Sequence, residues 1–306
     1  MQYSHFLPYR DGQLHIRHIK AKPESANNTA ILMLHGAMSN GRVFYSSSGK
    51  GLGCYLAEQG FDVYVLDTAG RGLSEPKISS AYSLGQTEVI LEQIPLAHEF
   101  VLSHSKASKV HWCAHSWGGV LMASTYVRIE KLRAQVASFV TFGTKRTIKV
   151  KSFRKTMMVD LFWNRVAPLL TRVDGYLAAE KYRMGMDNES RKSLLETIDW
   201  VRGDWIDLHD NFDYAQAVKN ITWPPSWFIA AKNDWVLGNP SDVKDMMGEC
   251  LMHDAEFTLL AKHNGFKRDY THAGMLTDSV AIDDHFPLVK QWYNSFSNSS
   301  EVSVNK

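Results

Sequence analysis

The sequence predicts an α/β fold in which helices cover both faces of a mostly parallel sheet. Six apolar runs of strand length recur along the chain, at 30–34, 61–66, 110–114, 136–142, 226–231 and 256–261. Strands that are buried on both faces give continuous apolar runs of this kind. Helical patterns separate most of the runs, and this alternation is typical of parallel α/β sheets.

Local signals place the remaining elements. Asp11-Gly12 predicts a hairpin turn within a strand pair over 9–21, followed by a polar loop at 22–29. Ser83 and Gln86 have capping-box spacing, which predicts the start of a long helix that Pro95 kinks. Further helices are expected over 51–59, over 120–132, from Asn239-Pro240 onward and over 284–296, and a polar tail at 297–306.

The alternation of strands and helices stops after the fourth run. From 144 to 220 the chain is helical and aromatic, and its clearest helical pattern covers 188–201. Pro224-Pro225 then marks the return to the sheet. We therefore predict a core made of 1–143 and 221–306, with a helical cap inserted at 144–220.

Composition limits the classes of function. The 306 residues carry a formal net charge of +2, which is too near balance to indicate a nucleic-acid partner. The three cysteines are scattered, which favours free thiols in a reducing compartment and offers no metal-ligand spacing. The N-terminus has no apolar stretch of signal-peptide length, and no run approaches the roughly 20 apolar residues of a membrane span. We expect a cytoplasmic protein without an integral membrane segment, and the oligomeric state stays open.

The stretch Ala114-His115-Ser116-Trp117-Gly118-Gly119 joins the third apolar run to the helix after it. A serine at such a junction, with small residues two positions to either side, has the pattern of a nucleophile elbow. The turn must be tight and strained so that the hydroxyl projects from the end of the sheet. The alternative is a serine at an ordinary helix N-cap.

A serine nucleophile needs a base and a carboxylate that orients the base. Asp234 follows the fifth run and His272 follows the sixth, so the chain order is serine, acid, histidine. His263 and His285 are rival bases. The Trp117 amide and an amide after His35-Gly36, that of Ala37, are the candidate donors of an oxyanion hole.

With these residues the chain resembles the α/β-hydrolase superfamily, in its esterase- and lipase-like branch with a serine nucleophile. The resemblance rests on His35-Gly36, on Asp67 to Ser74 (similar to D-x-R-G-x-G-x-S), on the elbow, on Asp234 and on His272. It spans nearly the whole chain in the order of that family. Ala114 replaces the first glycine of the elbow, and Arg71 lies two positions beyond the usual place of the arginine.

Other conspicuous residues have a structural interpretation beside a functional one. His115 is expected to pack beside the elbow, His35 to shape the oxyanion loop, Asp67 to order its own loop and Cys113 to be a small buried side chain. The basic stretch 145–155 predicts a solvated face, with an anionic substrate group or a membrane surface as the alternative. The aspartates of the cap are expected to be solvated: Asp204, Asp207, Asp210 and Asp213. Its large apolar side chains form either its own core or a roof over an acyl pocket: Phe153, Met157, Phe162, Trp163, Trp205 and Phe212.

Together these observations predict a serine hydrolase that acts on a small ester or related acyl substrate, apolar in character, through Ser116, His272 and Asp234. No cofactor or metal is implied. The same three residues also serve acyl transfer and carbon–carbon bond hydrolysis, and the fold also occurs in proteins that bind a ligand or partner without catalysis.

Overall fold

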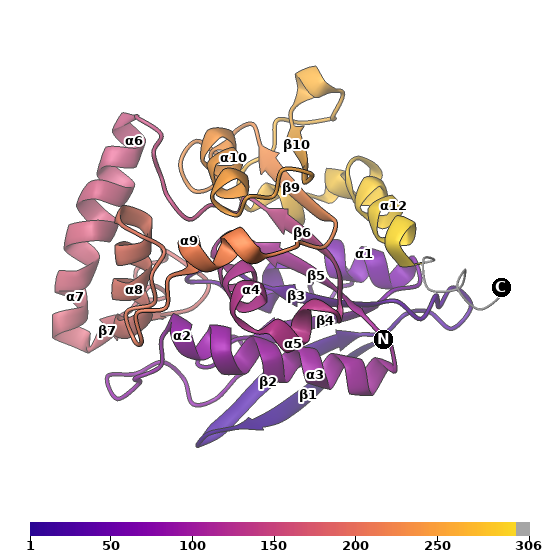
Figure 1. Ribbon diagram of the computed structural model, residues 1–306, viewed down its shortest axis with the longest axis horizontal. Helices are drawn as coiled ribbons and strands as arrows, with labels where there is room; N and C mark the ends of the chain where they lie inside the picture. Colours follow the sequence, from indigo (N-terminus) through magenta and orange to yellow (C-terminus); the bar gives the residue numbers. More distant parts are fainter. Residues whose placement is uncertain (298–306) are drawn as a thin grey trace.

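A computed structural model describes residues 1–297, which form an eight-stranded sheet between two layers of helices (Figure 1). The strand order is β1-β2-β4-β3-β5-β6-β9-β10. The two pairings β1–β2 and β2–β4 are antiparallel and the others are parallel. The strands are β1 Gln2–Tyr9, β2 Gly12–Ile19, β3 Ala30–Leu34, β4 Asp62–Asp67, β5 Val110–His115, β6 Val136–Phe142, β9 Ser226–Ala231 and β10 Glu256–Leu260.

Each face of the sheet is buried by its own helices. One face packs in a hydrophobic cluster with η2 Val89–Gln93, α3 Ile94–Ser105, α4 Trp117–Arg128 and α10 Pro240–Glu249. The opposite face packs with α1 Leu52–Glu58, α11 Gly274–Thr277 and α12 Phe286–Ser297. The remaining short helices are η1 Gly41–Val43, α2 Gln86–Glu88, α5 Glu130–Arg133, η5 Lys262–Asn264 and η6 Ser279–Asp283. The α/β fold with a doubly covered, mostly parallel sheet is therefore confirmed.

The inserted segment, residues 144–220, lies between β6 and β9 and adds no strand to the main sheet. Its elements are α6 Phe153–Lys155, η3 Thr156–Val166, α7 Ala167–Asp174, β7 Tyr176–Leu177, β8 Glu189–Ser190, α8 Arg191–Arg202, α9 Tyr214–Ala217 and η4 Val218–Asn220. Figure 1 shows α6, α7 and α8 grouped at one side of the molecule. A small hydrophobic cluster, centred on Leu177, Leu194 and Ile198, packs α7, β7 and α8 together.

Two local predictions were wrong. The hairpin pairs β1 with β2 from Gln2 onward, and its turn is Arg10-Asp11, since Tyr9 faces Gly12 across the ladder. The long helix begins at Gln86 instead of at Ser83. Its N-cap is Gly85, whose N–H donates to Glu88 Oε2 at 2.7 Å.

Apart from Ser297, the tail expected at 297–306 lies outside the described residues. Within residues 1–297, no helix combines the length and apolar character needed to cross a membrane.

Candidate active site

Ser116 forms a sharp, strained turn between β5 and α4. Its backbone has φ 53° and ψ −125°, a conformation that costs a residue with a side chain about 1–3 kcal/mol. The turn is held by the Ser116 N–H, which donates to the Phe142 carbonyl at 2.8 Å, and by Thr144 Oγ1, which donates to the Ser116 carbonyl at 2.9 Å. The Ser116 side chain accepts no hydrogen bond from the first turn of α4, so it is not an ordinary N-cap.

Two glycines let the loop after β3 lie against this turn. A Cβ atom on Gly118 would lie 2.3 Å from the His35 carbonyl oxygen, and one on Gly36 would lie 2.9 Å from the Ser116 Cβ. Both distances are far inside ordinary contact. The small residues of the elbow and of His35-Gly36 are therefore required by the same close approach.

His272 and Asp234 are hydrogen-bonded, although 38 residues separate them in the chain. His272 Nδ1–H donates to Asp234 Oδ2, and Asp234 is almost fully buried. The two loops are also joined by the Asn233 N–H, which donates to the Tyr270 carbonyl at 2.8 Å. A carboxylate in this position selects the tautomer in which His272 Nε2 carries a lone pair.

Two residues next to the serine turn contact His272. His115 Nε2–H donates to the His272 carbonyl at 3.2 Å, and the two imidazole centroids are 4.6 Å apart. A Cβ atom on Gly143 would lie 2.9 Å from His272 Nδ1, and Gly143 directly follows Phe142, whose carbonyl accepts the Ser116 N–H. Burial lowers the pKa of His115 far below its usual value, so its ring is neutral and acts as a support.

The rival histidines are placed elsewhere. His285 is buried, and its Nε2–H donates to the Met275 carbonyl at 2.7 Å; burial lowers the pKa of this imidazole to about 4. His263 is exposed on η5. Among the described residues, the histidine that hydrogen-bonds Asp234 is His272.

The two expected amide donors lie on either side of the turn. Trp117 is the first residue of α4, so no preceding helical turn accepts its N–H, and the positive end of the helix dipole lies there. Ala37 follows Gly36, and both Ala37 and Trp117 line the cavity beside the serine turn. His35 fixes this loop: its Nε2 accepts from the Thr68 N–H at 3.2 Å, so its Nδ1–H donates to the Gly36 carbonyl at 2.9 Å.

The cavity beside the serine turn is narrow, about 30 Å³. Its lining includes both apolar and polar residues, among the latter Gln86, whose Oε1 accepts from Trp117 Nε1 at 3.2 Å. The lining residues are His35, Gly36, Ala37, Thr68, Ala69, Arg71, Ile78, Tyr82, Leu84, Gly85, Gln86, Val89, Trp117, Leu121, Glu189, Ser190 and Ser193. This cavity takes a group of a few heavy atoms at most.

Sequence reasoning missed two buried carboxylates of the inserted segment. Asp187 Oδ2 accepts from Asn40 Nδ2 at 2.6 Å and from the Gly72 N–H at 2.8 Å. Glu189 forms a buried ion pair with Arg71. These contacts join the inserted segment to the loops after β3 and β4. No local pattern marks either residue, because each partner lies more than a hundred residues away.

Asp67 orders its loop, as predicted. Its carboxylate accepts from the Gly41 N–H at 2.7 Å, from the Leu73 N–H at 3.0 Å and from His15 Nδ1–H at 2.7 Å. Cys113 and Cys250 are fully buried and Cys54 is nearly so, and none of the three forms a disulfide. Burial raises the pKa of Cys113 to about 12, which makes it an unreactive side chain.

Several charged residues are buried, contrary to prediction. Lys145 and Arg146 are 6% and 7% exposed, so the basic stretch is a solvated face only in its later part. Burial lowers the pKa of Lys145 to about 8. Arg146 Nε donates to Glu249 Oε2 at 2.9 Å. Asp207 is also buried, because Arg128 Nη1 and Thr87 Oγ1 both donate to it at 2.9 Å.

The large apolar side chains of the inserted segment divide into two groups. Trp205 is buried in the main core, whereas Phe153 is 80% exposed and Met157 is also exposed. Arg154, next to Phe153, lies over the ring of Trp235 at 4.2 Å. Trp235 directly follows Asp234 and is half exposed. The Arg154–Trp235 contact therefore brings α6, with its exposed Phe153, next to the loop that carries Asp234.

The doubly covered parallel sheet, the strained serine turn at the carboxyl end of β5 and the buried aspartate–histidine pair together have the arrangement of the α/β-hydrolase class of proteins. The family model for the alpha/beta hydrolase fold matches residues 29–244, and the chain belongs to this family. No curated protein matches the sequence significantly.

Solved structures agree with this fold. A soluble variant of monoglyceride lipase from Saccharomyces cerevisiae is 16% identical, with 96% of each chain covered and a TM-score of 0.70. A thermophilic esterase from Thermogutta terrifontis is 12% identical, with 97% of this chain and 99% of that chain covered and a TM-score of 0.60. A carboxylesterase from Bacillus subtilis is 16% identical, with 97% and 91% covered and a TM-score of 0.56. At these identities the likeness concerns the fold.

Proposed function

We propose that this protein is a serine hydrolase that cleaves an ester or a related acyl substrate. The observation that carries the proposal is the hydrogen bond between the buried Asp234 and His272, formed beside the strained turn at Ser116. Strain at a single buried residue persists only where the surrounding structure maintains it, and such residues gather at active sites. The family assignment supports the same chemistry.

In the proposed reaction, Ser116 Oγ attacks the acyl carbonyl carbon while His272 Nε2 accepts the hydroxyl proton. The negative charge that develops on the carbonyl oxygen is stabilised by the amides of Ala37 and Trp117, each contributing roughly 3 kcal/mol. His272 then gives the proton to the departing alkoxide, which leaves an acyl-enzyme. A water molecule, deprotonated by His272, releases the carboxylic acid and restores Ser116. Asp234 orients the imidazole and stabilises its protonated form.

The surroundings of the turn support an apolar substrate with one small end. The cavity of about 30 Å³ suits a small group, and the larger apolar group would lie on the exposed surface of Phe153, Met157 and Trp235. In this proposal the inserted segment 144–220 acts as a cap on the core formed by 1–143 and 221–306. The free cysteines support the expectation of a reducing, cytoplasmic compartment.

A fluorophosphonate probe tests the nucleophile. We expect it to label the wild type and not Ser116→Ala, whereas Ser103→Ala, which changes an exposed serine on α3, keeps full labelling. Asp234→Asn and His272→Ala should each lower kcat by roughly 10⁴-fold. If the folded wild type is not labelled, a non-catalytic binding protein becomes the better interpretation.

A panel of p-nitrophenyl esters of increasing acyl length tests the substrate class. Activity that peaks on the acetyl ester would contradict an apolar acyl group. In that case the exposed apolar side chains would bind the alcohol part of the substrate. Product analysis with added alcohols separates hydrolysis from acyl transfer, because transfer yields a new ester at the expense of the free acid.

A further inference from the structure

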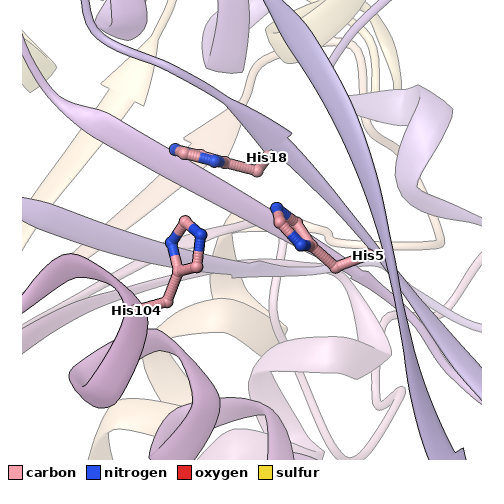
Figure 2. Close-up of side chains that lie close together, drawn as sticks. All are labelled: His5, His18 and His104. Carbon is pink, nitrogen blue, oxygen red and sulfur yellow. The ribbon is translucent and has the colours of Figure 1, made fainter.

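Three histidine side chains gather at the edge of the sheet that carries β1 and β2. His5 comes from β1, His18 from β2 and His104 from the last turn of α3. One ring nitrogen from each lies within 4.8 Å of the other two. Figure 2 shows the three rings turned toward a common space. Among the described residues, this is the group of histidines, cysteines and carboxylates whose spacing suits a metal ion.

The register of the hairpin explains why two of the rings share one face. His5 pairs with Ile16 and His18 pairs with Tyr3, so His5 and His18 are diagonal neighbours on the same side of the ladder. The carboxyl-terminal turn of α3 covers that side, and the His104 ring centroid lies 4.7 Å from that of His5 and 5.1 Å from that of His18. The three rings thus come from two separate parts of the chain.

In His18 and in His104, one ring nitrogen has a hydrogen-bond partner and the other can bind an ion. His18 Nε2–H donates to Asp62 Oδ1 at 3.3 Å, which leaves a lone pair on Nδ1. His104 Nδ1 lies 2.9 Å from the Tyr64 hydroxyl, so with Nδ1–H donating there, Nε2 has a lone pair. Histidine ligands of metals usually donate their second ring N–H in this way to a carboxylate or another oxygen.

His5 supplies an observation of a different kind. Its Nε2 atom is buried and has no hydrogen-bond partner among the described residues. A buried polar atom without a partner is unfavourable and calls for an explanation such as a water or an ion.

From this geometry we propose that His5, His18 and His104 form a binding site for a divalent transition-metal ion of the zinc class. Imidazole nitrogen suits Zn²⁺, Ni²⁺, Co²⁺ and Cu²⁺, whereas Mg²⁺ and Ca²⁺ prefer oxygen. Tetrahedral Zn²⁺ with bonds of about 2.0–2.1 Å brings nitrogens to roughly 3.4 Å from one another. A shift of the exposed His104 side chain toward the other two rings would close the group, and water would take the fourth position.

The ion would join the N-terminal hairpin to α3 and stabilise the fold. A ligand that binds only the folded chain raises its melting temperature by mass action. The expected signal is therefore a higher Tm with bound metal, independent of the proposed hydrolysis.

Packing alone is the competing explanation for the cluster. The His18 ring stacks on Tyr64 with centroids 4.3 Å apart, and the His5 ring lies 5.2 Å from that of Phe100. An aromatic cluster of this kind needs no ion. Replacing His5 by Phe keeps an aromatic ring in place and removes the ligand, so His5→Phe separates the two explanations.

The experiment measures metal binding by the full chain without a histidine tag. After treatment with a chelator, the wild type is titrated calorimetrically with ZnCl₂, and Co²⁺ is added separately to record visible absorption. We expect one strong Zn²⁺ site per chain, a rise in Tm, and the intense absorption of tetrahedral Co²⁺. His5→Phe and His104→Ala should lose these signals. Asp62→Asn should weaken binding by roughly 10–100-fold, since it removes only the carboxylate behind His18.

His253→Ala is the matched control, because His253 is an exposed histidine outside the cluster. It should bind Zn²⁺ as the wild type does. The proposal is overturned if the wild type shows no stoichiometric site, or if His5→Phe and His104→Ala, with wild-type circular dichroism, bind Zn²⁺ unchanged. Neither result bears on labelling of Ser116, so failure here is distinguishable from failure of the proposed function.

Discussion

Gly119, in the first turn of α4, gives the sharpest test of how the serine turn is held. A Cβ atom at this position would lie 2.1 Å from Thr144 Oγ1 and 2.6 Å from Thr144 Cγ2. Ordinary contacts between such atoms are about 3.5–4.0 Å, so Thr144 would have to move by more than an ångström. Thr144 Oγ1 donates to the Ser116 carbonyl, and this movement breaks that hydrogen bond.

The change in the free energy of unfolding expected for Gly119→Ala has two destabilising contributions and one stabilising contribution. Overpacking costs about 1–3 kcal/mol. The lost hydrogen bond adds about 1 kcal/mol, and the better helix propensity of alanine returns about the same amount. We therefore expect the free energy of unfolding to fall by about 1–3 kcal/mol. Because a shift of about 1 Å in a reacting group lowers rates by roughly 10²-fold, kcat should fall by that order.

Urea unfolding and kcat on a short p-nitrophenyl ester measure the two effects. Gly248→Ala is the control, because Gly248 lies in α10 and a Cβ there would meet no atom within 4 Å. That variant should be about 0.5–1 kcal/mol more stable, with unchanged kcat. If Gly119→Ala matches the wild type in both stability and kcat, Thr144 does not hold the turn as described.

Two further predictions concern buried charges. Arg71→Met leaves Glu189 buried and unpaired, so we expect it to lower the free energy of unfolding by about 3–5 kcal/mol, and Arg71→Met/Glu189→Gln to recover part of this in urea titrations. A loss below 1 kcal/mol for the single variant would contradict the pairing. Burial raises the pKa of Glu196 from 4.5 to about 7, so the folded chain holds a proton that the unfolded chain releases. Its contribution is therefore complete below pH 4.5 and is lost as the pH rises to about 7, by up to roughly 3 kcal/mol. Glu196→Gln should flatten this decline in urea titrations at successive pH values, and an unchanged slope would show that Glu196 is not responsible.

The parallel strands could be predicted from the sequence because their signal is local. Apart from β10 at the edge of the sheet, these strands are almost entirely buried, so their residues are predominantly apolar, and the observed bounds of β3, β6 and β9 coincide with the apolar runs. The serine turn is equally local, since a strained residue needs small neighbours within a few positions. The fold class and the position of the strained serine turn could therefore be predicted from short stretches of the chain.

Edge elements and long-range contacts left no such signal. β1 is a largely exposed edge strand with polar residues such as Ser4 and His5, so it has no apolar run and is specified by its pairing with β2. Arg71 and Glu189 are 118 positions apart, and their burial depends on how the inserted segment folds over the core. Asp207 was expected to be solvated for the same reason, because its partner Arg128 lies 79 positions away.

The inserted segment therefore contributes to the proposed chemistry through the loops it holds. The amide of Ala37 belongs to a loop whose next residues contact Asp187 and Glu189, since Asn40 donates to the first and the Met38 N–H donates to the second at 3.3 Å. A chain without 144–220 would lose both carboxylates, and with them the contacts that fix this loop. Shifting an oxyanion donor weakens stabilisation of the transition state more than binding of the substrate. Substitutions at Asp187 should accordingly lower kcat more than they raise KM, whereas a segment that only covered the substrate would act mainly on KM.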